Sequence, residues 1–453
     1  MAKIKNQEIA EFFCDDERHK KNMIYLREYD MFYRWENGWY KEIPSFNMSR
    51  LVYRFIKSKF GNVNINRNIV SDIILQIKWS ILREVENHNA GYFALRDVIY
   101  NLKSFETEPV DLEKIIIYFL DYPAEDLKGT PTTFLKFLET SLVIKDTVLP
   151  DFDLIDFVQE MFGFFLLDSM KGAGAFFLVG DGSNGKSVMA NLIQKMIGEQ
   201  FCSAMSIQTM TTNNFAVQHL VGKKVNVSNE EESKYMKSDK FKALITGERI
   251  SAERKFGDNF EFTPTTKYIF ASNELPTFDN INYGLMRRIK IIPFFRRFSD
   301  KDQDKDLDYK LEREMPAIIG WALEGAKRFV ANHYVFSTPS SSIDAGKEFE
   351  SQISSAIRFV SDNYEVDDSA FISNDELYAK YRTWCGDNGK KPVNSFKFHN
   401  DTTKNIPKLK TKATSSGSIS YRGKNLAPKY DEPDDYDHVV DPTPTKEESQ
   451  LAL

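Results

Sequence analysis

The sequence has few cysteines, and Cys14, Cys202 and Cys385 lie far apart in a chain of 453 residues. They form no CxxC pair and no zinc-binding spacing, which excludes a disulfide framework and a zinc module. The longest apolar runs, such as residues 173–180, fall far below the ~18 residues of a membrane span. The first residues also lack the apolar segment of a secretory signal. We therefore expect a reduced, cytoplasmic protein with no membrane partner.

Charge of both signs is present, but it is unevenly distributed along the chain. The net charge is −6, and residues 431–453 alone contain eight acids and one base. Residues 380–430 contain twelve bases and two acids. The basic stretch predicts a module that binds a polyanion. We interpret the acidic tail as a solvated, disordered end, because few apolar residues interrupt it.

Apolar periodicity predicts an α/β protein with several domains, since strands and helices alternate over residues 172–298. An Asn-Gly pair in residues 31–43 predicts a β-hairpin, whose aromatic side chains (32–40) either stack on nucleobases or form core. The predicted segments are an aromatic-rich α+β domain with helices at 47–60 and 68–87 (1–105), a helical linker or collar (106–170), an α/β domain (171–335), a linker with a Ser/Pro-rich start and a helix (336–370), a winged-helix-like domain (371–430) and the acidic tail (431–453).

The strongest motif is GDGSNGKS, which occupies residues 180–187 between a predicted buried strand (175–179) and a predicted helix (188–197). It fits the phosphate-binding loop pattern G-x-x-x-x-G-K-[ST] in its required context. Glycines let backbone N–H groups point at phosphate oxygens, the lysine reaches the outer phosphates, and the serine hydroxyl binds Mg²⁺. We assign ATP contacts to Gly180, Asp181, Gly182, Ser183, Asn184, Gly185, Lys186 and Ser187, with Ser187 also at the metal.

Acidic and amide side chains follow the next predicted strands. Glu230, Glu231 and Glu232 end the strand VNVSN, and an NTPase needs one acid near Mg²⁺ and one to polarise the attacking water. We assign Glu230 to the metal, and either Glu231 or Glu232 to the water. Asn273 ends the strand KYIFAS and could position that water, although Ser-Asn also begins ordinary turns.

Two further groups of basic residues accompany this core. Arg287 and Arg288 precede a strand, and one of them could serve a neighbouring subunit as an arginine finger; the alternative is a surface pair or a pair that faces DNA. Residues 246–264 read as a hairpin with Arg254, Lys255 and Phe256 at its tip. Those tip residues would suit contact with DNA phosphates in a ring pore, although any exposed hairpin can carry lysine.

The basic C-terminal segment has the order of a winged helix. Helices are predicted near 374–386 and 394–403, followed by strands at 408–414 and 419–424. The alternating bases suggest that one strand face meets duplex DNA phosphates; the alternative is a structural cap on the ring. These candidate DNA-binding bases are Lys408, Lys410, Lys412, Arg422 and Lys424.

Five motifs in this order resemble a known family. They are GDGSNGKS (180–187), VNVSNEEE (225–232), TGERISAERKFGDNFEFTP (246–264), YIFASNELP (268–276) and MRRIKIIPF (286–294). The chain is similar to superfamily 3 helicases of the phage, plasmid and poxvirus primase-helicase group and to replication initiators of phage-related chromosomal islands. The resemblance covers residues 150–335 well and residues 1–105 poorly.

The resemblance implies an AAA+ P-loop ATPase core that forms a homohexamer and moves along single-stranded DNA. It implies pore contacts at Arg254 and Lys255, a sensor at Asn273, and a finger at Arg287 or Arg288. We expect a replication initiator of a phage or mobile element in a bacterial host, with ATP and Mg²⁺ as cofactors. The alternative is an AAA+ loader or switch that hydrolyses ATP without unwinding. A metabolic kinase or GTPase is disfavoured, and no N-K-x-D guanine motif occurs.

Overall fold

The structure is a computed structural model that divides into two compact units, Met1–Phe349 and Glu350–Leu453. It describes residues 5–429 except 21, 28, 62–63, 84–90, 112–113, 230–234, 237, 254–258, 279–282, 300, 354, 391, 407 and 417–418. None of the helices in this described part has the length and apolarity that a membrane crossing requires.

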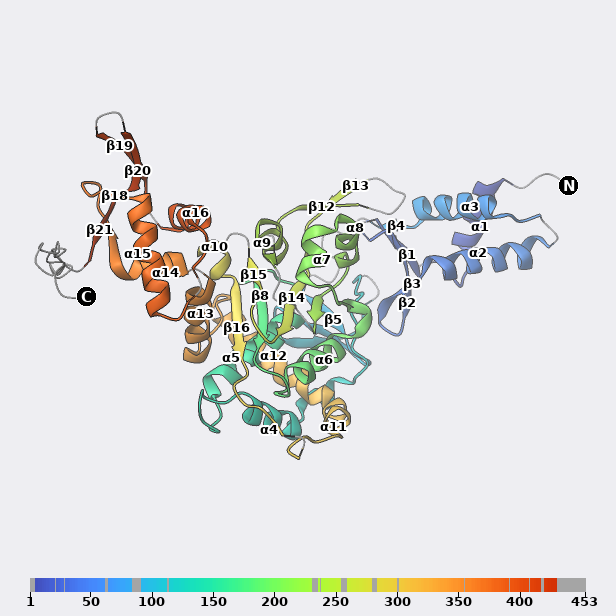
Figure 1. Ribbon diagram of the computed structural model, residues 1–453. Helices are drawn as coiled ribbons and strands as arrows, with labels where there is room; N and C mark the ends of the chain where they lie inside the picture. Colours follow the sequence, from blue (N-terminus) through green and yellow to red (C-terminus); the bar gives the residue numbers. More distant parts are fainter. Residues whose placement is uncertain are drawn as a thin grey trace, which may run out of the picture. The chain divides into compact units, whose positions relative to one another are not determined.

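The N-terminal region packs three helices against a small sheet (Figure 1). Its elements are α1 (Asn6–Asp15), β1 (Met23–Leu26), β2 (Met31–Glu36), β3 (Trp39–Ile43), α2 (Ser45–Phe60), α3 (Arg67–Ser80) and β4 (Leu82–Arg83), with sheet order β3-β2-β1-β4. The expected hairpin is confirmed, and its turn residues Asn37 and Gly38 have φ of 49° and 102°.

The aromatic stripe of this hairpin is mainly core. Phe32, Tyr33 and Tyr40 are buried, and Trp39 stacks on Phe119 with ring centroids 4.8 Å apart. The structure therefore favours the core alternative over base stacking. Helix α3 ends at Ser80, so the helix expected to reach residue 87 is shorter, and the chain enters β4.

The following region leads into the central core. Its elements are β5 (Tyr92–Ala94), β6 (Ile99–Asn101), β7 (Glu106–Glu108), the 3₁₀ helix η1 (Ala124–Lys128), α4 (Thr132–Ser141) and α5 (Phe152–Leu166). η1 and α4 begin directly after Pro123 and Pro131, and α5 begins two residues after Pro150. Proline fixes φ and lacks an N–H, which suits these positions at or just before a first helical turn.

The central sheet has five parallel strands in the order β16-β8-β14-β10-β9. They are β8 (Ala175–Val179), β9 (Cys202–Ser203), β10 (Val225–Ser228), β14 (Lys267–Ser272) and β16 (Ile289–Pro293). The connecting helices are α6 (Lys186–Ile197), α7 (Ile207–Thr212), α8 (Asn214–Val217) and α9 (Ser238–Thr246), with the short 3₁₀ helices η2 (Glu199–Phe201) and η3 (Gln218–Leu220). The expected α/β class with a parallel sheet is confirmed.

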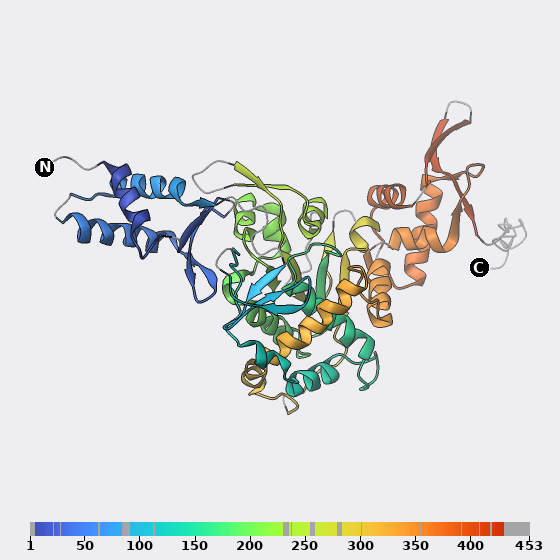
Figure 2. The same ribbon diagram turned by 180° about the vertical axis from the view of Figure 1, so that it is seen from behind.

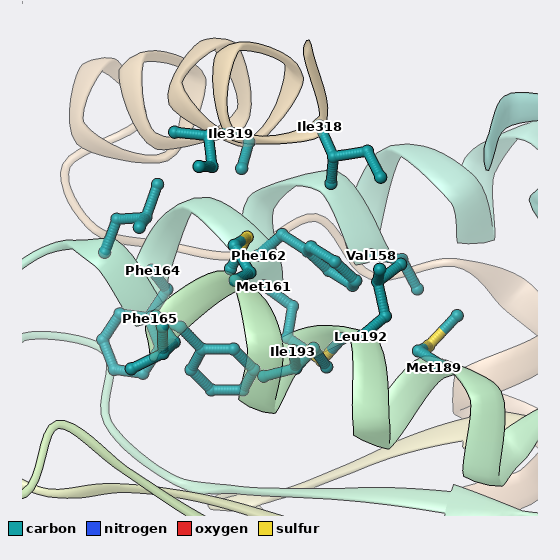
Figure 3. Packing of buried hydrophobic residues seen from close by; sticks show 14 of the residues in the cluster. Val158, Met161, Phe162, Phe164, Phe165, Met189, Leu192, Ile193, Ile318 and Ile319 are labelled. Carbon is teal, nitrogen blue, oxygen red and sulfur yellow. The ribbon is translucent and has the colours of Figure 1, made fainter. Parts of the chain in front are cut away.

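Helices cover both faces of this sheet, which explains why its strands read as continuous apolar runs. Phe176 packs against Phe164 and Phe165 of α5, while the neighbouring Phe177 packs against Phe241 of α9. Figure 3 shows the first face, where side chains of α5, α6 and α12 (Met315–Ala331) point toward one another. Because α5 belongs to this core, the segment expected as a collar (106–170) is not separated from the α/β domain.

The pair α5 and α12 lies unusually close (Figures 1 and 2). A Cβ at Gly163 would lie 2.2 Å from Ala326 N, and one at Gly325 would lie 2.1 Å from Gln159 O. Only glycine allows this approach, so the two helices support the sheet as one rigid layer.

The rest of the first unit surrounds the sheet. It comprises β11 (Tyr235–Met236), β12 (Ile250–Glu253), β13 (Asn259–Phe262), β15 (Thr277–Phe278), α10 (Tyr283–Met286), α11 (Leu307–Arg313) and, up to the unit boundary at Phe349, α13 (Ser340–Ile353). The linker predicted to begin the segment 336–370 is short, because helix α13 begins at Ser340, directly after Pro339. Ser342 Oγ also donates to Ile291 O at 2.6 Å, which anchors this turn to β16.

The second unit has its own apolar core, around Phe359, Tyr381 and Phe398. Its elements are α14 (Ser355–Asn363), β17 (Tyr364–Val366), β18 (Ile372–Ser373), α15 (Asn374–Asp387), α16 (Ser395–Asn405), β19 (Thr411–Ser416), β20 (Ile419–Lys424) and β21 (Leu426–Pro428). Its sheets have the orders β18-β20-β19 and β17-β21. The expected order of two helices and a hairpin is present, and the acidic tail lies outside the described residues.

Candidate nucleotide-binding site

The loop from Gly180 to Lys186 joins strand β8 of the central sheet to helix α6. A Cβ at Gly180 would lie 2.3 Å from Phe294 O, because the loop passes close to the chain that leaves β16. Gly185 adopts φ of 97° immediately before α6, a conformation that favours glycine. The motif's glycines therefore serve close approach and a left-handed turn. The first N–H of α6, that of Lys186, donates to Asn184 Oδ1 at 3.4 Å. The N–H groups that follow it at this helix end are the ones that an anion can bind.

Lys186 is the central cation of this loop and is only 7% exposed. Its ammonium donates to Gly180 O, to Asp181 O at 3.2 Å and to Asn184 Oδ1 at 3.2 Å. It also lies 3.4 Å from Asn273 Oδ1, at the end of β14. Burial lowers the pKa of Lys186. These contacts are to neutral oxygens, so the ammonium can exchange them for the charged oxygens of a phosphate.

A cavity of about 1210 Å³ opens beside this loop. Loop residues 182–188 line it together with residues 271–273 of β14 and its end, and with Asn229, which follows β10. The carboxyl ends of these parallel strands meet at one edge of the sheet, which is where α/β proteins bind ligands. The cavity is large enough for a nucleoside triphosphate.

Two further walls of the cavity were not anticipated from the sequence. One is α4, whose first N–H groups are capped by the Glu314 carboxylate: Thr133 and Phe134 donate to it at 2.9 and 3.0 Å. The other contains Arg296, whose guanidinium lies 5.0 Å from the Phe298 ring centre and 3.4 Å from Thr140 O. Arg296 and Arg297 form a basic pair after β16 in the sequence, but such a pair does not by itself predict which cavity it lines.

The structure brings several predicted residues together at the cavity. Gly182, Ser183, Asn184, Gly185, Lys186, Ser187 and Asn273 line it. Gly180 and Asp181 contact the Lys186 ammonium through their carbonyl oxygens, although neither lines the cavity. The three acids Glu230, Glu231 and Glu232 lie outside the described residues, as do Arg254, Lys255 and Phe256. The hairpin arms beside the latter, β12 and β13, pair as expected.

Neither Arg287 nor Arg288 lines the cavity of its own chain. Arg287 is exposed, whereas the half-buried Arg288 donates from Nη1 to Gly284 O at 2.5 Å. The Arg288 backbone also accepts a hydrogen bond from Ala175 N at 2.9 Å, at the start of β8. Arg287 is therefore the freer of the two side chains.

The C-terminal hairpin requires a correction. Lys424 is 2% exposed, and its ammonium donates to Thr403 Oγ1 and to Thr411 Oγ1, the latter at 3.0 Å. Burial lowers the pKa of Lys424. A lysine held in this way does not face a phosphate backbone, so its assignment to DNA is wrong.

The expected single basic face of this hairpin is also wrong. Residues opposite each other in an antiparallel pair share a face, and Arg422 lies opposite Ala413 while Lys412 lies opposite Gly423. Arg422 and Lys412 therefore point to opposite faces. Lys412 donates to Asp368 O and Lys410 lies 3.4 Å from the Asp368 carboxylate, whereas Arg422 and Lys408 are exposed.

Comparisons with known proteins agree with the division into two regions. Residues 178–288 match a family of unknown function (DUF5906), and residues 355–440 match the poxvirus D5 protein-like family. The first match spans the GDGSNGKS loop (180–187) and strands β10 and β14. Each model covers well under half of the chain.

Viral proteins are similar to parts of the chain. "Putative helicase L207/L206" of Acanthamoeba polyphaga mimivirus is 25% identical over 159 residues, covering 33% of this chain and 16% of its own length. "Putative helicase 121R" of Invertebrate iridescent virus 3 is 24% identical over 245 residues, covering 46% of this chain and 26% of its own length. The chain thus spans about a quarter or less of these relatives.

A solved structure shows a similar fold. The A form apo structure of the C-terminal region of NrS-1 covers 93% of this chain and 100% of its own, with a TM-score of 0.50 and 12% identity. The chain therefore shares a mixed α/β fold with that region, and it is related in sequence to viral proteins that carry helicase names.

Proposed function

We propose that the protein is an ATP-driven DNA helicase of the superfamily 3 type and a replication initiator of a phage or mobile genetic element. The observation that carries this proposal is the meeting of Lys186 and Asn273, 3.4 Å apart, at a 1210 Å³ cavity on the carboxyl edge of a parallel sheet. Numbered along the chain, the sheet strands have the order 5-1-4-3-2, which supports an AAA+ core. The helicase names of the viral relatives support DNA as the substrate.

In this proposal the chain's own groups position ATP and a water molecule. Lys186 and the first N–H groups of α6 bind the outer phosphates, and Asn273 orients the water. Ser187 is exposed at the cavity, and the acids after Asn229 follow the end of β10, so the chain offers the hydroxyl and carboxylate that Mg²⁺ sites use beside substrate phosphates. Mg²⁺ supplies charge neutralisation to the phosphates when bound.

Single-stranded DNA provides the test of this function. A helicase motor should hydrolyse ATP several-fold faster when a single strand is added, whereas a metabolic kinase or GTPase should not respond. ATP hydrolysis is measured by phosphate release with and without an oligonucleotide of mixed sequence. An activity that ignores DNA, or no ATPase activity at all, contradicts the proposal.

The homohexamer and its arginine finger form a second part of the proposal. Arg287 is exposed and lies off its own cavity, as a residue that serves a neighbouring subunit would. Arg287→Ala should bind ATP but hydrolyse it poorly. Mixing it with Glu230→Gln subunits should restore part of the activity, because one mixed interface joins an intact finger to an intact site. No rescue in mixtures shown to form mixed rings contradicts a finger in trans.

The third part is duplex DNA binding by the second unit. The segment 380–430 is strongly basic, and it follows the unit boundary at residue 349. Truncation after Phe349 should weaken binding to duplex DNA and leave part of the ATPase activity. Retained duplex affinity would assign residues 371–430 to a structural cap instead.

A further inference from the structure

Helix α2 has one buried face and one exposed face of unusual composition. Met48, Val52, Phe55 and Ile56 are buried in the N-terminal core. Five exposed residues lie on the opposite side at spacings of three, four and seven, so they share one face. This outward α2 face consists of Phe46, Arg50, Tyr53, Arg54 and Lys57.

The aromatic members of this face are open to solvent. Phe46 is 77% exposed and Tyr53 is 44% exposed, although the helix offers apolar neighbours on its other side. The Lys57 ammonium lies 5.9 Å from the centre of the Tyr53 ring, so cation and ring already stand beside each other. Phe46 therefore adds its ring to the surface of α2 and not to the N-terminal core.

The charge of the face has one sign. Helix α2 contains Arg50, Arg54, Lys57 and Lys59 and no acidic residue. Among the ion pairs formed by the described residues, none includes any of these four bases. Their charge is therefore available to an external anion, in contrast to exposed lysines of the first unit such as Lys128 and Lys347, which pair with acids.

We propose that the outward α2 face binds single-stranded nucleic acid. Phe46 to Lys57 spans about 16 Å of helix at ~1.5 Å per residue, which matches several phosphates at ~3.4 Å along one strand. Arg50, Arg54 and Lys57 contact these phosphates, and Phe46 and Tyr53 stack on bases. Stacking needs unpaired bases with open ring faces, which a duplex does not present along its backbone. None of its five residues lines the nucleotide cavity, and all five belong to the first unit.

The test measures binding of the full chain without nucleotide, by fluorescence anisotropy of a labelled oligo-dT 20-mer and of a 20-base-pair duplex at several salt concentrations. Arg50→Ala/Arg54→Ala/Lys57→Ala should weaken single-strand binding and reduce the salt slope by about 2, since each lost contact removes ~0.7. Phe46→Ala/Tyr53→Ala should weaken it at least about fivefold with an unchanged slope.

Matched controls separate this surface from charge or exposure in general. Lys128→Ala/Lys327→Ala/Lys347→Ala removes three lysines that are ion-paired, and Phe152→Ala/Tyr309→Ala removes two rings that are 63% and 64% exposed. Both control variants should bind like wild type.

Three outcomes would overturn the proposal. The first is a single-strand affinity that is unchanged in both α2 variants. The second is a loss of affinity that occurs only in the charge variant and is equally large for single-stranded and duplex DNA. The third is a change of molar mass in light scattering while the affinity for DNA is retained. The last would make the face an interface between copies of the chain. A wild type without ATPase activity would contradict the proposed helicase but not this binding result.

Discussion

The phosphate-binding loop and the C-terminal hairpin carry the same kind of sequence signal, a lysine expected to meet phosphate, yet the structure treats them differently. Lys186 lies beside an open cavity and contacts neutral oxygens of its own loop and Asn273. Lys424 lies in a closed core between Thr403 and Thr411. A base identified by charge alone is therefore not yet a base that a ligand can reach.

The difference follows from what positions each side chain. Lys186 is placed by a strand, a glycine-dependent turn and a helix that are consecutive in sequence. Lys424 is placed by the pairing register of β19 and β20 and by α16, about twenty residues away. A shift of one residue in that register would exchange the two faces. A local motif thus determines the position of Lys186, whereas tertiary contacts determine the position of Lys424.

The largest effect is expected at the loop. Lys186→Ala should lower the ATP hydrolysis rate by about 100-fold or more, because a preorganised cation is removed from the developing phosphoryl charge. The matched control is Lys195→Ala on the same helix, whose exposed side chain pairs with Glu312. Steady-state phosphate release measures both rates. An equal loss of ATP hydrolysis in both variants, or no loss in Lys186→Ala, would contradict the assignment of the nucleotide site.

The next effect is one of stability. Lys424→Ala should lower the free energy of unfolding of the second unit by about 1–3 kcal/mol, since a buried stem and two hydrogen bonds are lost. Its affinity for duplex DNA at temperatures where it is folded should remain that of wild type. Denaturant titration measures the free energy of unfolding, and fluorescence anisotropy measures the affinity for duplex DNA. A variant that is as stable as wild type but binds DNA more weakly would show that Lys424 contacts DNA after all.

A second buried lysine, Lys267, should make the folding stability depend on pH. Burial lowers the pKa of Lys267 to about 7, the nearby Lys224 adds to this, and Asp168 opposes it. The unfolded chain keeps this proton up to about pH 10, whereas the folded chain releases it above about pH 7. Folding stability attributable to Lys267 should therefore rise with pH across that window.

The measurement is the free energy of unfolding of wild type and Lys267→Met at pH 6.5 and pH 9.5. The advantage of the Met variant should be largest at the lower pH and should shrink at the higher pH. Lys195→Met, which changes an exposed lysine on α6, should show no such trend. A difference for Lys267→Met that is independent of pH would contradict the assignment.

The smallest effect is expected at Arg422, which is exposed and lies on the face opposite Lys412. Arg422→Ala should change stability by less than about 0.5 kcal/mol and should reduce the salt slope of duplex binding by about 0.9. An unchanged slope would indicate that this face of the hairpin does not touch DNA.

Much of the fold follows from local patterns, as the Asn37-Gly38 hairpin and the strand-loop-helix around Gly185 show. The nucleotide cavity follows only in part. Asn273 could be predicted as a lining residue, because the ends of parallel strands meet at one edge of the sheet. Helix α4 and Arg296 could not be predicted, because each lies about forty residues of sequence or more from the loop and reaches the cavity only through tertiary packing. The close approach at Gly163 had no local signal either, since its partner Ala326 lies on α12.

The outward face of α2 is a second feature that the sequence alone did not identify. Its bases were present in the sequence, yet a helical period alone does not tell which of its two faces is buried. The structure resolves this, because Val52 and Phe55 enter the core and Phe46 remains 77% exposed. Base stacking, which was considered for residues 32–40, is therefore proposed for Phe46 and Tyr53 of α2 instead.

Strand displacement on a forked DNA duplex tests the central claim most directly. Wild type should release the labelled strand when ATP and Mg²⁺ are present and should not do so without ATP, while Lys186→Ala should release none and Lys195→Ala should act like wild type. ATP hydrolysis that DNA stimulates but that displaces no strand would contradict a helicase and favour a loader or switch.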